Sequence, residues 1–211
     1  MMLFVDTANL DEIREAAAMG VLDGVTTNPS LIAKEGVDYG TRLADICELV
    51  DGPVSAEVIA TESDAMIAEG RERAKIADNI VVKLPSTVDG LRACKALSDE
   101  GVDTNLTLCF QPVQALMVAK AGAYCVSPFI GRVDDIGADG TELIAQIRNI
   151  YDNYGLRTKI LAASIRHMKH MVDVAAIGAD IATVPFGVIK QFMHHPLTDA
   201  GLEKFLADYK K

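Results

Sequence analysis

The sequence predicts an α/β protein built as a single (β/α)8 TIM barrel with an extra C-terminal helix, and three observations lead to this prediction. Short apolar segments alternate with longer amphipathic segments from one end of the chain to the other. The apolar segments are nearly continuous runs, as expected for parallel strands that are covered on both faces. The length of 211 residues lies near the lower end of the range for such a barrel.

Eight strand–helix units can be placed in order along the chain. The expected strands are residues 3–6, 24–27, 54–59, 80–84, 103–108, 124–130, 159–163 and 181–185. The expected helices are residues 10–19, 41–50, 64–77, 88–100, 112–121, 140–153, 168–177 and 186–193. Asn9 is a suitable N-cap for the first helix, and Pro112 suits the first turn of the fifth. A last helix over 203–209 would cap the barrel or reach a neighbouring subunit.

Domain boundaries are not indicated anywhere in the sequence. No Ser/Pro/Gly-rich linker, low-complexity tract or strong internal repeat interrupts the pattern, so residues 1–211, with the helix at about 203–209, are expected to form one barrel domain. The competing fold is an open doubly wound sheet. Its glycine-rich phosphate loop would follow the first strand, but that strand continues directly into Asp6, Thr7, Ala8 and Asn9.

The composition excludes several classes of partner. The chain carries 30 acidic and 20 basic residues, a net charge of −10, which argues against nucleic acid and anionic membranes. A phosphorylated small molecule stays possible, because a local arginine cluster can bind phosphate within an acidic protein. No apolar run approaches the roughly 18 residues of a membrane span. Four cysteines without a C-x-x-C pair and an N-terminus without a signal-peptide pattern predict a reduced, cytoplasmic protein.

Polar residues lie within or just after these apolar strands, where barrel enzymes place their active sites. The candidates are Asp6, Thr27, Asn28, Glu57, Lys83, Asn105, Thr107, Ser127, Phe129, Arg132, Ser164 and Arg166.

Lys83 is the most informative of these residues. It is flanked by Val81, Val82 and Leu84, so its side chain is expected to lie inside the barrel. Burying an ammonium ion is costly, which favours the neutral amine that Schiff-base chemistry needs. The structural alternatives are a lysine that extends out at the strand end, or one that pairs with Glu57.

The other charged candidates have alternatives as well. Asp6 and Glu57 could transfer protons, or could balance the charge of Lys83, and Asp6 could cap the next helix. Arg132, Ser164 and Arg166 could bind a phosphate, whereas Arg132 could instead form a surface ion pair with Asp134 or Asp135. The four histidines provide no third ligand at a spacing suited to a metal, so solvated or helix-capping roles are expected for them.

Five segments together resemble the family of small transaldolases, which also contains the fructose 6-phosphate aldolases. They are FVDTA at 4–8, GVTTNPS at 24–30, IVVKLP at 80–85, SPFIGR at 127–132 and LAASIR at 161–166. The resemblance covers essentially the whole chain and implies a (β/α)8 barrel with a Schiff-base lysine on the fourth strand. It also implies sugar-phosphate substrates, no metal or organic cofactor, and self-association into a homopentamer or homodecamer through the C-terminal helix.

The resemblance also implies a role for each matching residue. Lys83 would form the Schiff base, Asp6 would act as the acid and base at the cleaved bond, and Glu57 would act through a water held with Thr107. The dihydroxyacetone part of the substrate would bind Asn28, Asn105 and Ser127, with Thr27 and Phe129 beside them. The substrate phosphate would bind Arg132, Ser164 and Arg166.

Two positions separate the sub-families and favour transaldolase of the pentose phosphate pathway. The aldolases resemble this chain but carry Gln in place of Glu57 and Tyr in place of Phe129. The reaction implied is the transfer of a dihydroxyacetone unit from sedoheptulose 7-phosphate or fructose 6-phosphate to glyceraldehyde 3-phosphate or erythrose 4-phosphate. The alternatives are an aldolase that releases dihydroxyacetone, a barrel that binds or isomerises sugar phosphates without a covalent intermediate, and a non-catalytic scaffold.

Overall fold

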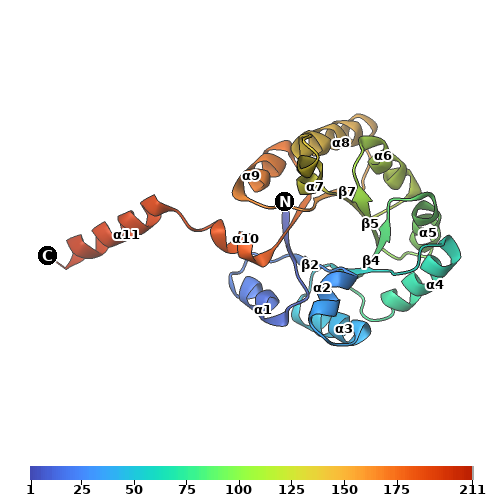
Figure 1. Cartoon of the computed structure of the whole chain (residues 1–211), viewed down its shortest axis with the longest axis horizontal. Helices are drawn as coiled ribbons and strands as arrows, with labels where there is room; N and C mark the ends of the chain where they lie inside the picture. The colour runs from blue at the N-terminus through green and yellow to red at the C-terminus, as the bar shows by residue number, and fades with distance from the viewer. Residues whose placement is uncertain (211) are drawn as a thin grey trace.

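In the computed structural model, which describes residues 1–210, eight parallel strands close into a barrel surrounded by helices (Figure 1). Neighbouring strands follow chain order, and β1 (Met2–Asp6) closes the barrel by pairing with β8 (Ile181–Val184). The strands between them are β2 (Gly24–Thr26), β3 (Val54–Glu57), β4 (Ile80–Pro85), β5 (Thr104–Cys109), β6 (Cys125–Pro128) and β7 (Lys159–Ala162). The predicted fold class is therefore confirmed. Residue 211, the last of the predicted domain, lies outside the described residues.

The helices among residues 1–210 include all those expected from the sequence. They are α1 (Leu10–Ala18), α2 (Pro29–Lys34), α3 (Tyr39–Leu49), α4 (Ser63–Ala74), α5 (Val88–Asp99), α6 (Pro112–Ala121), α7 (Ile130–Asp135), α8 (Gly140–Tyr154), α9 (Met168–Ile177), α10 (Phe186–Gln191) and α11 (Pro196–Tyr209). The side chain of Asn9 accepts hydrogen bonds from the first turn of α1, and Pro112 opens α6, as predicted.

Three differences from the predicted elements have physical causes. Two six-residue helices, α2 and α7, are not expected from the sequence, because each is an extra element between a strand and the helix already expected to follow it, and six residues show little helical period. The sixth strand was expected to reach Ile130, but it ends at Pro128, and Ile130 begins α7. The last helix begins at Pro196 and not at 203, since His195 caps it and proline fits its first turn.

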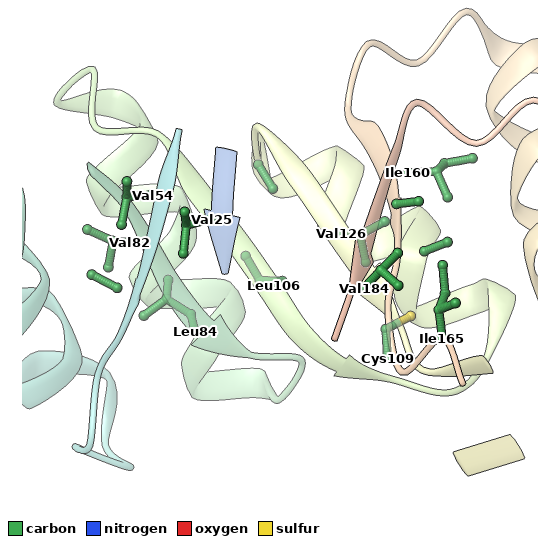
Figure 2. Close-up of a cluster of buried hydrophobic side chains, with 14 of the residues drawn as sticks. Val25, Val54, Val82, Leu84, Leu106, Cys109, Val126, Ile160, Ile165 and Val184 are labelled. Atoms are coloured by element: carbon green, nitrogen blue, oxygen red, sulfur yellow. The ribbon is translucent and has the colours of Figure 1, made fainter. Parts of the chain in front are cut away.

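Outward-facing side chains of the strands form the main core, between the sheet and the helices. Val82 and Leu84 on β4 and Leu106 on β5 belong to this core, and Figure 2 shows them with their neighbours. Each is fully buried, and burying one such side chain stabilises a fold by about 1.5–3 kcal/mol. Because side chains alternate along a strand, the outward direction of Val82 and Leu84 turns the residue between them, Lys83, into the barrel.

A second apolar cluster fills the interior of the barrel. Four of its buried residues come from the first strand and the last three: Phe4 on β1, Cys125 on β6, Leu161 on β7 and Ile181 on β8. The ring of Phe4 packs so closely against Gly24 that a Cβ at that glycine would lie 2.6 Å from it. The polar site residues lie further toward the C-terminal ends of the strands.

The C-terminal helix α11 extends away from the barrel (Figure 1). None of its residues is buried, although it carries Leu202, Phe205 and Leu206, and Phe205 is 71% exposed. Within residues 1–210, no helix combines the length and the apolar character needed to cross a membrane.

Candidate active site

A cavity of about 520 Å³ opens at the C-terminal ends of the strands. Nine of the twelve predicted site residues line it, and the whole lining comes from seven of the strands and from the segments that follow them. The lining consists of Asp6, Thr26, Asn28, Pro29, Ser30, Leu31, Lys34, Glu57, Lys83, Thr107, Leu108, Ser127, Phe129, Arg132, Ala163, Ser164 and Thr183. The lining is therefore shared between charged groups deep in the barrel and groups on the loops.

Lys83 projects from β4 into this cavity and is only 6% exposed. Its Nζ lies 2.9 Å from Oε2 of Glu57 and donates a hydrogen bond of 3.0 Å to the carbonyl oxygen of Thr27. The pairing with Glu57 follows from the strand register, in which these two residues are direct neighbours on β3 and β4. Lys83 thus faces the cavity with one acidic partner, and the alternative of a lysine that reaches bulk solvent is excluded.

The strand end that carries Glu57 is fixed from the neighbouring helix layer. The hydroxyl of Tyr39 donates a 2.7 Å hydrogen bond to the backbone oxygen of Glu57, and the guanidinium of Arg73 stacks over the Tyr39 ring. Burial raises the pKa of Tyr39 to about 12, so the phenol stays protonated and remains a donor.

Asp6 ends β1 beside a pair of threonines. Its Oδ1 accepts a 2.8 Å hydrogen bond from Thr26, whose hydroxyl lies 2.5 Å from that of Thr183. Burial raises the pKa of the Asp6 carboxyl above its ordinary value, while the positive charge of Lys83 acts in the opposite direction. A carboxyl with a raised pKa near an amine can both accept and return a proton, which is what acid–base catalysis requires.

Thr107 and Asn105 come from β5, and the structure places them differently. The buried hydroxyl of Thr107 lines the cavity and has no hydrogen-bond partner among residues 1–210. Such a buried group usually binds water or a ligand. Asn105 is fully buried behind the cavity lining, where its side chain accepts a 2.6 Å hydrogen bond from Ser127 and donates one to Ser55.

The arginine end of the cavity is built from α7 and from the loop between β7 and α9. Arg132 and Ser164 line the cavity, and the Arg132 guanidinium lies 4.8 Å from the centre of the Phe129 ring. Ser164 has a left-handed backbone with φ of 62°, a conformation that costs about 1–3 kcal/mol outside glycine and concentrates at functional sites.

Arg166 and Thr27 do not line the cavity. The guanidinium of Arg166 donates to both carboxylate oxygens of Asp135, and the Arg166 side chain is 47% exposed. The side chain of Thr27 donates to the backbone oxygen of Ser55. Thr27 therefore contributes to the site only through its carbonyl oxygen, which accepts from Lys83. Of the two aspartates that could have paired with Arg132, Asp135 is thus bound by Arg166, and Asp134 lies 2.7 Å from Nε2 of His170.

Sequence reasoning missed several lining residues. Thr183 lies on β8 beside Phe4 of β1, and a threonine within a strand carries no distinctive sequence signal. Leu108 has φ of 58° beside a break in the β5–β6 register, and no sequence signal marks that irregularity. Leu31 and Lys34 come from α2, which was not predicted.

The cysteines and histidines lie away from this chemistry. All four cysteines are free, and burial raises the pKa of Cys109 to about 11, which keeps its thiol protonated. His167 and His195 cap α9 and α11, as expected of capping histidines. His170 is different, because it is buried and its Nε2 lies 2.7 Å from Asp134.

The chain is similar to known proteins over its whole length. The family model for transaldolase/fructose-6-phosphate aldolase matches residues 3–211. All 211 residues align at 63% identity with 97% of a protein from Dinoroseobacter shibae that is named "probable transaldolase". Proteins with the same name from Desulfosudis oleivorans and Bacillus cereus are 57% and 60% identical over the full chain, with 99% and 98% of their lengths covered.

Proposed function

This chain belongs to the transaldolase/fructose-6-phosphate aldolase family, and we propose that it is a transaldolase that transfers a dihydroxyacetone unit between sugar phosphates through a Schiff base on Lys83. The observation that carries the proposal is the buried lysine, which faces a 520 Å³ cavity and is paired with one carboxylate while a second, Asp6, lines the same cavity. The proposed donor is sedoheptulose 7-phosphate or fructose 6-phosphate, and the proposed acceptor is glyceraldehyde 3-phosphate or erythrose 4-phosphate.

The reaction begins when Lys83 attacks the ketose carbonyl carbon. Glu57, 2.9 Å from Nζ, accepts the proton that the amine must lose before it attacks. It then returns a proton to the carbinolamine hydroxyl, which leaves as water, through a water molecule held by the unpartnered hydroxyl of Thr107. The product of this step is a protonated imine between substrate and Lys83.

Carbon–carbon cleavage follows from this imine. Asp6 takes the proton of the hydroxyl on the far carbon of the bond that breaks, that carbon becomes the aldehyde, and the bonding electrons move into the imine to form an enamine. An aldose phosphate leaves. The enamine carbon then attacks the aldehyde of the second aldose phosphate, Asp6 returns its proton to the new hydroxyl, and water releases the ketose product from Lys83. The imine is the electron sink, so these steps use no metal or organic cofactor.

The three-carbon unit is held by hydrogen bonds from the lining. Asn28 and Ser127 face the cavity, and Asn105 orients the Ser127 hydroxyl from behind. The substrate phosphate binds at Arg132 and Ser164. Arg166 joins them by leaving Asp135, because an exposed ion pair of this kind contributes at most about 1 kcal/mol and a phosphate dianion is a stronger partner.

Transfer is favoured over release by the identity of Phe129. Its ring lies at the cavity wall, 5.8 Å from the Phe110 ring in an edge-on arrangement. A tyrosine hydroxyl at this position could direct water or a proton to the enamine, and the phenyl ring cannot. The enamine therefore persists until an acceptor aldehyde arrives.

The full chain is proposed to act as a homopentamer or homodecamer in the cytoplasm. Leu202, Phe205, Leu206 and Tyr209 recur at helical spacing along α11, and all are exposed. A helix whose apolar side is uncovered in one chain suits a contact with a second copy. The free cysteines suit a reducing compartment.

The proposal is tested by measuring glyceraldehyde 3-phosphate release from fructose 6-phosphate with and without erythrose 4-phosphate. Sustained release that requires the acceptor is expected of a transaldolase. Equal release without the acceptor would make the chain an aldolase, and Phe129 would not be the discriminating residue. No release in either case would remove the catalytic proposal and leave the fold unchanged.

A further inference from the structure

The arginine end of the cavity depends on the contact between two separate segments. Arg132 lies on α7, whereas Ser164 and Arg166 lie on the loop after β7. The two segments touch at Gly131, where a Cβ would lie 2.3 Å from the backbone oxygen of Ser164 and 2.7 Å from Nε of Arg166. A small shift of the loop would therefore change the spacing between the groups that face the phosphate.

His170, on α9, contacts both of these segments. It is 5% exposed, and its Nδ1 accepts a 3.3 Å hydrogen bond from the backbone N–H of Arg166. Its Nε2 lies 2.7 Å from Oδ2 of Asp134 on α7, and Oδ1 of the same aspartate accepts from the backbone N–H of Gly140 at the start of α8. The imidazole thus joins the loop to two helices through buried or half-buried contacts.

These two contacts require a neutral His170 imidazole that carries its proton on Nε2. Nδ1 must be unprotonated to accept from Arg166, and Nε2 must carry the proton that is donated to Asp134. Burial lowers the pKa of His170, and the adjacent His167 acts in the same direction, while Asp134 and Asp173 oppose them. An imidazolium would leave the Arg166 N–H without its acceptor.

We propose that His170 is a positioning residue for the substrate phosphate, which holds the Ser164–Arg166 loop against α7 so that Arg132 and Ser164 converge on one anion. The inference rests on the proposed function, because it assigns the phosphate of the sugar substrate to this end of the cavity. Asp134 and Asp135 act on the same loop residue in different ways. Asp134 fixes the backbone of Arg166 through His170, whereas Asp135 holds its side chain.

The test compares three substitutions of His170 that remove different parts of the link. His170→Phe keeps the ring volume and removes both hydrogen bonds. His170→Asn keeps an acceptor near the position of Nδ1, and His170→Gln keeps a donor that reaches toward Asp134. Thr87→Ala is the matched control, because it removes the N-cap of α5, which belongs to neither of the two linked segments, and its loss of stability should be comparable.

Two readouts separate positioning from general stability. The first is the dissociation constant of inorganic phosphate for the unreacted full-length protein, measured by calorimetry. The second is the ratio of kcat/KM for glyceraldehyde 3-phosphate to that for unphosphorylated glyceraldehyde as acceptor. In His170→Phe we expect phosphate to bind about tenfold more weakly and the ratio to fall by a similar factor through KM. His170→Asn and His170→Gln should lie between this variant and the wild type, and Thr87→Ala should leave both quantities unchanged.

Some outcomes would overturn the inference. Equal losses for both acceptors with an unchanged phosphate constant would make His170 a purely structural residue. Failure of the wild-type protein to bind phosphate would also overturn it, although trapping of a donor on Lys83 would leave the transferase assignment intact. Conversely, weaker phosphate binding in the folded His170 variants would support the inference even if no transfer activity were found.

Discussion

The two ends of the cavity are built on different principles. At one end, Lys83, Glu57 and Asp6 come from the strands themselves. Lys83 is buried and Asp6 is half-buried, and each has hydrogen-bond partners. At the other end, Arg132 and Arg166 lie on a six-residue helix and a loop, and the bidentate partner of Arg166 is an exposed aspartate. The first end is fixed by the barrel, and the second by contacts between the segments that follow two strands.

This difference corresponds to the two tasks of the site. Covalent chemistry at a lysine needs partly desolvated groups in fixed positions, because proton transfers and bond formation depend on distance and on a low local dielectric. Phosphate capture needs cations that can exchange water or a weak partner for an anion, which an exposed arginine can do. The two ends should therefore respond differently to substitution.

The largest effect is expected at the buried end, for Lys83→Ala. This change removes the nucleophile, so all transfer activity and all borohydride trapping of the donor should be lost. Lys159→Ala is the matched control, because this lysine lies at the start of β7, where it donates to the hydroxyl of Tyr124. Mass spectrometry of the trapped adduct checks both variants, and trapping that persisted in Lys83→Ala would refute the assignment.

Asp6→Asn should produce a loss of activity together with a gain in stability. Activity should fall by roughly 10²–10⁴-fold, the usual contribution of one acid–base group. The raised pKa means that the folded state binds more protons than the unfolded state just above pH 3.8, so the wild type loses stability as pH rises through that window. Asparagine avoids this loss and can still accept the hydrogen bond from Thr26.

Thermal denaturation of both proteins across pH checks this prediction. The melting temperature of Asp6→Asn should exceed that of the wild type at pH 7, and the difference should shrink toward acidic pH. A variant that is less stable at pH 7 would show that the attraction between Asp6 and Lys83 outweighs the cost of burying the carboxylate.

The smallest effect is expected at the exposed end, for Arg132→Gln. Losing a charged hydrogen-bond donor to phosphate should lower kcat/KM for glyceraldehyde 3-phosphate by about 10–100-fold, mainly through KM. Activity with unphosphorylated glyceraldehyde should change little, and Arg132→Lys should be intermediate because it keeps the charge but not the bidentate geometry. Equal losses with both acceptors, measured by steady-state kinetics, would remove the functional distinction between the two ends.

Much of the barrel could be predicted because its signals are local. The apolar run 80–84, the N-cap Asn9 and the first-turn Pro112 each mark an element. The observed bounds of these elements differ from the predicted bounds by only a few residues. The short helices α2 and α7 could not be recognised, since six residues hold fewer than two helical turns and the regular order of strand and helix requires neither of them. The equally short α10 was expected, because the eighth strand needs a helix after it. The extent of the single domain stays a prediction.

The candidate site divides in the same way. Lys83, Glu57 and Asp6 could be selected from the sequence because a charged residue inside or at the end of an apolar strand is conspicuous. Thr183 and Leu108 were missed, because an ordinary threonine in a strand and a local break in register carry no distinctive pattern. His170 was assigned to a solvated or capping role, since burial cannot be read from a histidine near a helix start.

The sequence by itself determined the order of strands and helices and the residues that carry charge into the barrel, because both depend on patterns within short segments. Only the tertiary structure decided which of these residues meet. The 2.9 Å pair between Lys83 and Glu57 depends on strand register, and the exclusion of Arg166 from the cavity depends on its contact with Asp135. Such contacts join segments far apart in the chain, so their geometry is set by packing of the whole barrel and not by any local preference.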